Sequence, residues 1–184
     1  MSLALCKPLR YFISDGSGSL LHHIERLGDS IDFLQIREPN LSARDLAALT
    51  RDVLRTAHPA VRVLVNDRAD IALACGAQGV HLRSNSIAPA RLRNVLPAEF
   101  LISVSCHCAA DVARAEQESA DMALLSPIFA TPGKGAPLGL AELENATRNV
   151  TIPVLALGGV TEADIPRCLS AGAAGVAGIR LFAA

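Results

Sequence analysis

Short apolar runs alternate with segments of helical spacing along the whole chain. We predict strands at the apolar runs and helices at the segments between them. The predicted strands are residues 9–14, 31–37, 61–65, 79–82, 101–105, 122–129, 154–157 and 175–182. The predicted helices are residues 20–27, 43–57, 69–75, 89–95, 110–119, 140–148 and 162–170. This rhythm predicts parallel strands joined by helical crossovers.

The alternation fits either an open doubly wound sheet or a closed eight-stranded barrel. An internal repeat favours the barrel, because residues 63–80 resemble residues 154–176 four strand–helix units later, as two half-barrels would place them. We therefore predict one compact TIM (β/α)8 barrel domain over residues 1–184, with its eighth helix missing. A partner subunit, forming a homodimer, or an omitted tail would cover the groove that this helix leaves.

Composition narrows the class of partner. The chain is 51% hydrophobic and 3% aromatic, and its net charge is −1. Without a basic cluster, this charge argues against nucleic acid or an anionic membrane as a partner. No apolar run approaches the ~20 residues of a membrane span, and the N-terminus lacks the features of a signal peptide. We expect a cytoplasmic protein that acts on small molecules and whose five cysteines are reduced.

Polar residues gather where the predicted strands end. In a parallel barrel the functional site lies at the C-terminal ends of the strands. Seven of the eight predicted strands end in such residues, which are Gln35, Arg37, Glu38, Asn66, Asp67, Arg68, His81, Arg83, Ser105, His107, Thr131, Lys134, Gly158, Gly159 and Arg180. Solvation of strand ends alone accounts poorly for so regular a pattern.

Two loops are candidate phosphate sites. Lys134, one of two lysines in the chain, lies on a loop rich in glycine and proline after an apolar strand. This loop is either a phosphate-binding segment or an ordinary surface loop. Gly158 and Gly159 would let backbone N–H groups approach an anion, with Arg180 adding charge. Alternatively, the two glycines form a tight turn and Arg180 pairs with a carboxylate.

The sequence also contains candidate metal ligands. Asp67 is a candidate ligand for Mg²⁺, or it pairs with Arg68. Zinc ligands could come from His81 and the consecutive Cys106, His107 and Cys108, but neighbours on an extended chain point to opposite faces, so a zinc site is disfavoured. His107 is either an acid/base group or a hydrogen-bonded histidine at a strand end.

Taken together, the motifs of the strand ends resemble those of thiamine phosphate synthase, over almost the whole chain. In chain order they begin at Gln35, Asn66, Gly76, Val104, Ser126, Pro137 and Ala156, and read QIRE, NDRAD, GAQGVHL, VS, SPIFxTxxK, PLG and ALGG. The same superfamily holds a thiazole tautomerase with a barrel of this kind.

The resemblance implies a transferase that joins hydroxymethylpyrimidine diphosphate to thiazole phosphate and releases diphosphate with the help of Mg²⁺. It implies Gln35 and Ser105 for the pyrimidine, Arg37, Asn66 and Lys134 for the diphosphate, Asp67 for Mg²⁺, and Thr131, Gly159 and the backbone of Ile179 and Arg180 for the thiazole phosphate. Gly158 and His107 are further candidate substrate-binding residues.

Several positions depart from the family pattern. A lysine that binds diphosphate in the family is Pro39 here, and a second aspartate ligand of Mg²⁺ is Ser86. A threonine of the lysine loop is Gly133, and a serine after the last strand is Arg180. Arg83, where the family has a small residue, would replace lost charge but not a metal ligand.

Two readings follow from these departures. The first is a synthase with reduced activity. The second is a diverged member, either a tautomerase-type salvage enzyme or a non-catalytic binder of thiazole phosphate. The histidine of the tautomerase falls on Pro127, which has no proton to move.

Overall fold

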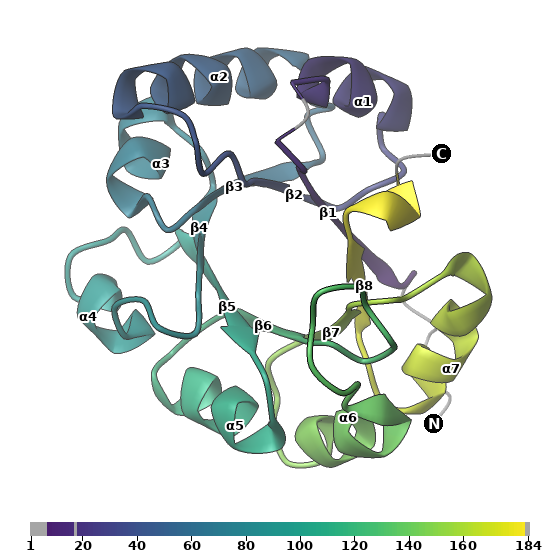
Figure 1. Cartoon of the computed structure of the whole chain (residues 1–184). Coiled ribbons are helices and arrows are strands. Elements are labelled where there is room, and N and C mark those ends of the chain that lie inside the picture. Colours follow the sequence, from purple (N-terminus) through teal and green to yellow (C-terminus); the bar gives the residue numbers. More distant parts are fainter. Residues whose placement is uncertain (1–6, 17, 183–184) are drawn as a thin grey trace.

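Eight parallel strands close into a barrel, with the helices in a ring around it (Figure 1). The structure is a computed structural model, and it describes residues 7–16 and 18–182. Each strand pairs with the next along the chain, and the last pairs with the first, Leu9 lying opposite Gly175. The closed barrel is confirmed, and the open sheet is wrong.

The elements follow one another in the order that the sequence predicts. The strands are β1 (Leu9–Ile13), β2 (Phe33–Ile36), β3 (Arg62–Asn66), β4 (Gly79–Leu82), β5 (Leu101–Cys106), β6 (Met122–Leu125), β7 (Val154–Leu157) and β8 (Gly175–Gly178). The helices are α1 (Leu20–Leu27), α2 (Ala43–Thr56), α3 (Ala69–Cys75), α4 (Pro89–Arg93), α5 (Ala109–Gln117), α6 (Gly139–Thr147) and α7 (Ile165–Ser170), with 3-10 turns η1 (Glu162–Asp164) and η2 (Arg180–Phe182).

Local signals set several of these boundaries. Ser42 begins α2, and its hydroxyl accepts the backbone N–H of Asp45 at 3.2 Å. Gly76 ends α3 in the left-handed conformation, with φ +80°. Thr161 and Asp164 cap each other's backbone N–H groups at η1. The last predicted helix therefore divides into η1 and α7.

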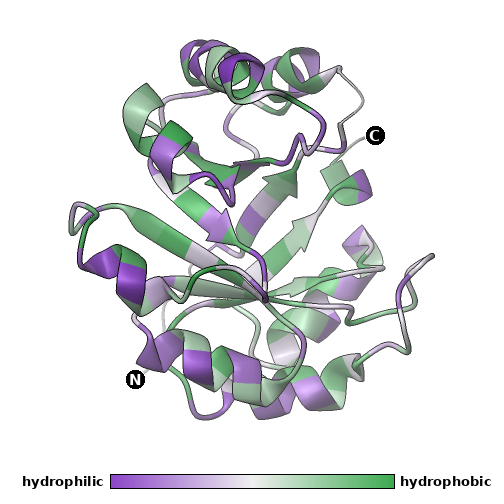
Figure 2. Cartoon of the chain, turned by 60° about the vertical axis from the view of Figure 1, so that its left-hand side comes forward, coloured by the Kyte–Doolittle hydropathy of each residue, from purple (hydrophilic) through white to green (hydrophobic). Residues whose placement is uncertain are grey.

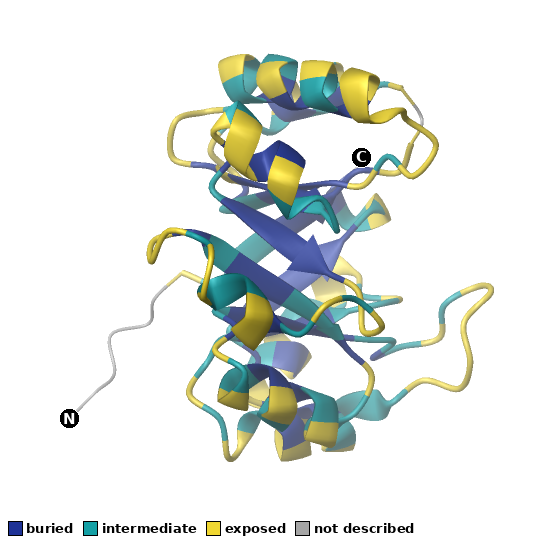
Figure 3. Cartoon of the chain, turned by 90° about the vertical axis from the view of Figure 1, so that its left-hand side faces the viewer, coloured by how far each residue is buried: buried dark blue, intermediate teal, exposed yellow. Residues whose placement is uncertain are grey.

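The hydrophobic core has three parts. One cluster fills the barrel and includes Tyr11, Ile13, Leu64, Leu124 and Leu155. Two outer clusters lie between strands and helices, one mainly under α1–α3 and the other under α5–α7. Figure 2 shows the apolar strands inside the polar helix faces, and Figure 3 shows buried strands beneath helices with exposed outer faces. The two outer clusters match the two half-barrels of the internal repeat.

Four predicted strands are too long, and the two largest errors, of four residues each, are at the ends of β6 and β8. β6 ends at Leu125 rather than at residue 129, because Pro127 has no N–H for the ladder. Ile128 and Phe129 still follow β7, since their N–H groups donate to Leu157 and Gly158 at 2.9 Å. The last strand ends at residue 178, where the chain turns toward η2 instead of continuing.

Within the described part of the chain, β8 is followed by η2 and not by an α-helix. Phe182 packs edge-on against Phe12, with ring centroids 6.1 Å apart. The Arg10 guanidinium lies 5.0 Å from the centroid of the Phe182 ring and reaches Glu162 at 2.7 Å. These side chains cover part of the wall where an eighth helix would pack. None of the helices described here has the length and apolar character needed to span a bilayer.

Candidate functional site

A layer of polar side chains crosses the barrel at the C-terminal ends of its strands. Gln35 of β2 is buried, and its amide nitrogen donates to Oδ1 of Asn66 at 2.9 Å. The other amide atom, Gln35 Oε1, is buried without a hydrogen-bond partner among the described residues. A buried carbonyl oxygen without a donor is costly, so this position is suited to a ligand that brings one.

His81 belongs to the same layer, where it pairs in register with Asn66 on the neighbouring strand. His81 of β4 is 3% exposed, and its ring nitrogens each meet a serine of β5. Nδ1 lies 2.9 Å from Ser103 Oγ, and Nε2 lies 2.8 Å from Ser105 Oγ. Burial lowers the pKa of His81 to about 4, opposed by Asp67 and assisted by Arg37. The imidazole is therefore neutral near pH 7.

Sequence reasoning missed two members of this layer, Tyr11 and Ser103. The Tyr11 hydroxyl is fully buried, and burial raises its pKa far above the usual range, although Ser103 partly offsets the rise. The available signal was the period-two pattern in β5, where Ser103 and Ser105 interrupt an apolar strand on the same face. Only the barrel register, which pairs His81 with Ser103, shows what they contact.

Asp67 pairs with Arg83 and not with Arg68. The Arg83 guanidinium binds Asp67 Oδ2, and the backbone N–H of Arg83 donates to Oδ1 at 3.1 Å. Arg68 instead binds Asp70 with two hydrogen bonds of 2.8 and 2.6 Å. Asp67 has φ +54°, which places its backbone in the left-handed region. The predicted alternative pairing of Asp67 with Arg68 is wrong.

This arrangement does not fit a resident Mg²⁺ ion. Both Asp67 oxygens are engaged by Arg83, and the second expected carboxylate is Ser86. No group of three or more His, Cys, Asp and Glu side chains among the described residues is arranged to hold a metal. Cys106, one of the zinc candidates, is buried, and burial raises its pKa to about 12, so the free side chain is a protonated thiol near pH 7.

The three candidate cations at the rim, Arg37, Arg83 and Lys134, are solvent-exposed. Arg37 follows β2, and its backbone N–H donates to Ser14 Oγ at 2.8 Å, while Ser14 donates to Glu38. Lys134 lies on the loop between β6 and α6, which projects from the barrel in Figure 3. Among the described residues the exposed Lys134 ammonium has no hydrogen bond or ion pair, which leaves it available to an anion.

Gly158 and Gly159 lie against the loop that follows β6. Both have positive φ, +92° and +65°. A Cβ on Gly158 would come 2.8 Å from Pro127 Cα and 3.2 Å from Thr131 Oγ1, and one on Gly159 would come 2.5 Å from the Ala130 carbonyl oxygen. Only glycine fits such close backbone approaches. The two loops therefore form one surface, to which Thr131 belongs.

The remaining candidates lie at the ends of β5 and β8. His107 Nδ1 donates to the Ser126 carbonyl oxygen at 2.9 Å, which ties the end of β5 to that of β6. Ile179 packs against the inner core, and the exposed Arg180 begins η2. No ion pair of Arg180 with a carboxylate occurs among the described residues, and its role toward a phosphate stays a prediction.

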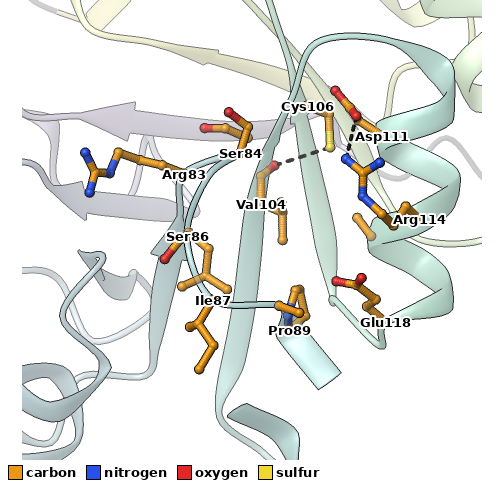
Figure 4. A pocket seen from close by; sticks show the side chains of 14 residues that line it. Arg83, Ser84, Ser86, Ile87, Pro89, Val104, Cys106, Asp111, Arg114 and Glu118 are labelled. Atoms are coloured by element: carbon orange, nitrogen blue, oxygen red, sulfur yellow. Dashed lines mark hydrogen bonds and ion pairs between the residues drawn. The ribbon is translucent and has the colours of Figure 1, made fainter. Parts of the chain in front are cut away.

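Two cavities flank the barrel mouth. One, of about 130 Å³, lies between β4, β5, α4 and α5 and is lined by Ser86, Ser105 and the Asp111–Arg114 pair (Figure 4). The Arg83 side chain points away from that pair in Figure 4. The other, of about 170 Å³, is lined by Pro39, Asn66 and residues of β2 and α2. The second cavity therefore borders the polar layer beside Gln35.

Comparisons with known proteins agree with this geometry. The family model described as thiamine monophosphate synthase matches residues 11–182. A protein of Geobacter sulfurreducens is 43% identical over 176 residues, 91% of this chain and 83% of its own. A relative from Methanoculleus marisnigri, named thiamine-phosphate synthase, is 40% identical over 152 residues, 79% of this chain and 71% of its own. The solved thiamine phosphate pyrophosphorylase from Pyrococcus furiosus superposes with a TM-score of 0.85 at 25% identity, covering 96% of this chain and 88% of that one.

Proposed function

We propose that this chain, which belongs to the thiamine monophosphate synthase family, couples hydroxymethylpyrimidine diphosphate to thiazole phosphate. It is a transferase that releases diphosphate and forms thiamine phosphate. The observation that carries this assignment is Gln35, a buried amide whose Oε1 has no partner in the barrel and whose amide nitrogen is held by Asn66. Such an oxygen accepts a hydrogen bond from the amino group of the pyrimidine.

The reaction breaks one bond and makes one. The C–O bond between the pyrimidine methylene and the diphosphate breaks, and its electron pair leaves with the diphosphate. The lone pair of the thiazole nitrogen then forms the new C–N bond. No proton is transferred in either event, so the site needs charge stabilisation rather than an acid and a base. The neutral His81 and the carbonyl-bonded His107 agree with this requirement.

We assign the diphosphate to the cationic rim. Arg37, Arg83 and Lys134 are exposed side chains at the ends of β2, β4 and β6. The Arg83 side chain is 63% exposed, and an ion pair of this exposure contributes about 1 kcal/mol or less. Its contact with Asp67 is therefore weak enough for a diphosphate to compete for the guanidinium.

Magnesium enters the proposal only in general terms. Enzymes of this family are generally Mg²⁺-dependent, and the sequence suggested Asp67 as the ligand. Because Arg83 occupies that carboxylate, we assign no resident ion to Asp67 and derive no step through one. The side chains at the rim supply the charge that we assign to the leaving group.

We assign the thiazole phosphate to Thr131, Gly158 and Gly159, with backbone groups at Ile179 and Arg180. Glycines with positive φ expose backbone N–H groups that side chains would otherwise shield. The two loops pack too closely for a Cβ at either glycine, so they present one preformed surface.

The cytoplasmic location and the homodimer stay predictions.

Product formation tests the function. Purified protein is mixed with the two substrates, in Mg²⁺ and in excess chelator, and thiamine phosphate is measured by chromatography. We expect product above the uncatalysed rate. Absence of product under both conditions, with both substrates binding by calorimetry, would overturn the assignment. A protein that binds thiazole phosphate alone would be the non-catalytic relative that the sequence left open.

A tautomerase is the second candidate. A change from synthase chemistry is favoured by the departures at Ser86 and Pro39 and by the ion pair between Asp67 and Arg83. Against it, Pro127 occupies the position of the histidine that would move the proton. Turnover of a thiazole tautomer by this protein, without pyrimidine diphosphate, would support this candidate.

A further inference from the structure

The polar groups inside the barrel form a series of neighbouring side chains that no proposed step uses. It runs from the Tyr11 hydroxyl past Ser103 to the His81 ring and on to Ser105. We infer that His81 is a positioning residue, which holds Ser105 as a hydrogen-bond donor toward an acceptor nitrogen of the pyrimidine ring. This inference rests on the proposed function and extends it by naming the substrate atom that Ser105 binds, which is a ring nitrogen of the pyrimidine.

Counting hydrogens sets the direction of the chain. Tyr11 and the two serines carry one hydroxyl hydrogen each, and a neutral imidazole carries one N–H. The Tyr11 hydroxyl is buried without a partner at bonding distance among the described residues, and Ser103 is the hydroxyl that affects its pKa. In the first direction Ser103 donates to His81 Nδ1 and His81 Nε2 donates to Ser105, which leaves a lone pair of Ser103 Oγ for the Tyr11 hydroxyl hydrogen.

The opposite direction leaves a hydrogen unused. If Nδ1 carried the proton, it would donate to Ser103, and Ser103 would donate to the Tyr11 oxygen. The hydroxyl hydrogen of Tyr11 would then lie in a fully buried position with no acceptor. A buried donor without an acceptor carries a desolvation penalty, so the first direction is favoured.

This direction decides what Ser105 offers a ligand. Once Ser105 accepts from His81 Nε2, its own hydrogen is free, and the half-buried hydroxyl lies at the end of β5. Gln35 Oε1, on β2, offers an acceptor in the same layer. One donor and one acceptor complement a ring nitrogen and an exocyclic amino group, which the pyrimidine of thiamine carries. A ligand with a C–H in place of that nitrogen would leave the Ser105 hydrogen unpaired.

Ligand analogues and the variant His81→Leu test this inference. Calorimetry measures the affinity of each protein for the pyrimidine diphosphate and for the two pyridine analogues that replace one ring nitrogen by C–H. We expect the wild type to prefer the pyrimidine over one analogue about tenfold, and His81→Leu to lose that preference. His81→Gln, whose amide carries both a donor and an acceptor, should restore most of it. Affinity for thiazole phosphate, as the internal control, should stay unchanged.

Each result distinguishes the inference from the proposed function. A wild type that makes thiamine phosphate without preferring the pyrimidine over either analogue would overturn the inference alone. Retention of the preference in His81→Leu would do the same. A wild type that binds neither the pyrimidine nor its analogues would overturn the proposed function and the inference with it. If His81→Leu does not fold, ¹⁵N NMR spectra of the wild-type imidazole show which ring nitrogen carries the proton. A proton on Nδ1 instead of Nε2 would contradict the inferred direction of the hydrogen bonds.

Discussion

The sharpest test of the glycine surface is Gly159→Ala. Gly159 has φ +65°, and its missing Cβ would lie 2.5 Å from the Ala130 carbonyl oxygen and 2.9 Å from the carbonyl carbon of Phe129. Both atoms belong to the backbone, so no side-chain rotation relieves the contact. The added methyl group must either strain the turn or displace the loop that carries Thr131.

The structure allows the two costs to be separated. A left-handed backbone costs an ordinary residue roughly 1–2 kcal/mol, and overpacking costs roughly 1–3 kcal/mol more. Gly76 supplies the matched control, because it has φ +80° and no atom within 4 Å of its missing Cβ. Gly76→Ala should therefore carry the backbone cost alone. The difference between the two variants is about 1–3 kcal/mol, or roughly 2–12 °C in Tm for a chain of this size.

Urea unfolding and the KM for thiazole phosphate are measured on both variants. Stability loss beyond that of Gly76→Ala means that the loop resists. A raised KM with little extra loss of stability means that the loop moves and the phosphate surface opens. Equal stability of the two variants, together with an unchanged KM, would refute the argument that these glycines hold two loops in one phosphate surface.

Three further predictions concern charge and protonation. Lys134→Ala should abolish turnover while shifting stability by less than about 0.5 kcal/mol, whereas Arg91→Ala, which removes an exposed cation of α4, should leave turnover unchanged; equal activity in both would contradict the diphosphate role. Arg83→Ala frees Asp67, so its turnover should depend more steeply on Mg²⁺ in a titration than that of the wild type, and identical curves would argue against this competition. The folded pKa of His81, about 4, lies below its unfolded value, so the unfolded state binds more protons between these two pH values. The free energy of unfolding should therefore fall by about 3 kcal/mol as the pH drops from 6.5 to 4. His81→Gln should lose this part of the pH dependence, as measured by urea unfolding.

The order and type of the elements could be predicted because apolar periodicity and capping residues are local signals. The bounds of residues 20–27, 69–75, 79–82 and 154–157 agree with the structure. The predictions fail at the ends of β6 and β8, where strand length is decided by the neighbouring strand and not by the apolar run. Pro127 and Gly178 end these strands within apolar sequence. Only the three-dimensional register distinguishes a strand end from a buried loop.

That the candidate residues gather at one end of the barrel could be predicted as well, because parallel strands place their C-terminal ends on one face; that this end is the functional site stays a prediction. The partners within it could not. Arg68 follows Asp67 in the chain, yet the left-handed turn at Asp67 and the short path to Asp70 send Arg68 elsewhere. Arg83, directly after β4, reaches Asp67 instead. Pairing across strands depends on register and turn geometry, which one sequence does not display.

Rigidity and exposure divide the site between recognition and charge. The groups that we assign to the pyrimidine are buried or half-buried, and each is held by a neighbouring strand: Gln35 by Asn66 and Ser105 by His81. The cations that we assign to the diphosphate are exposed and weakly held, as the 63% exposure of the Arg83 side chain illustrates. A flat aromatic ring is read best by groups that do not move, because a small displacement breaks its hydrogen bonds. A departing diphosphate changes position and charge during the reaction, and long, exposed side chains can follow it. This division also explains how Pro39 is tolerated, since a positive charge lost at a mobile rim can be replaced from another strand by Arg83, whereas a buried amide has no substitute nearby.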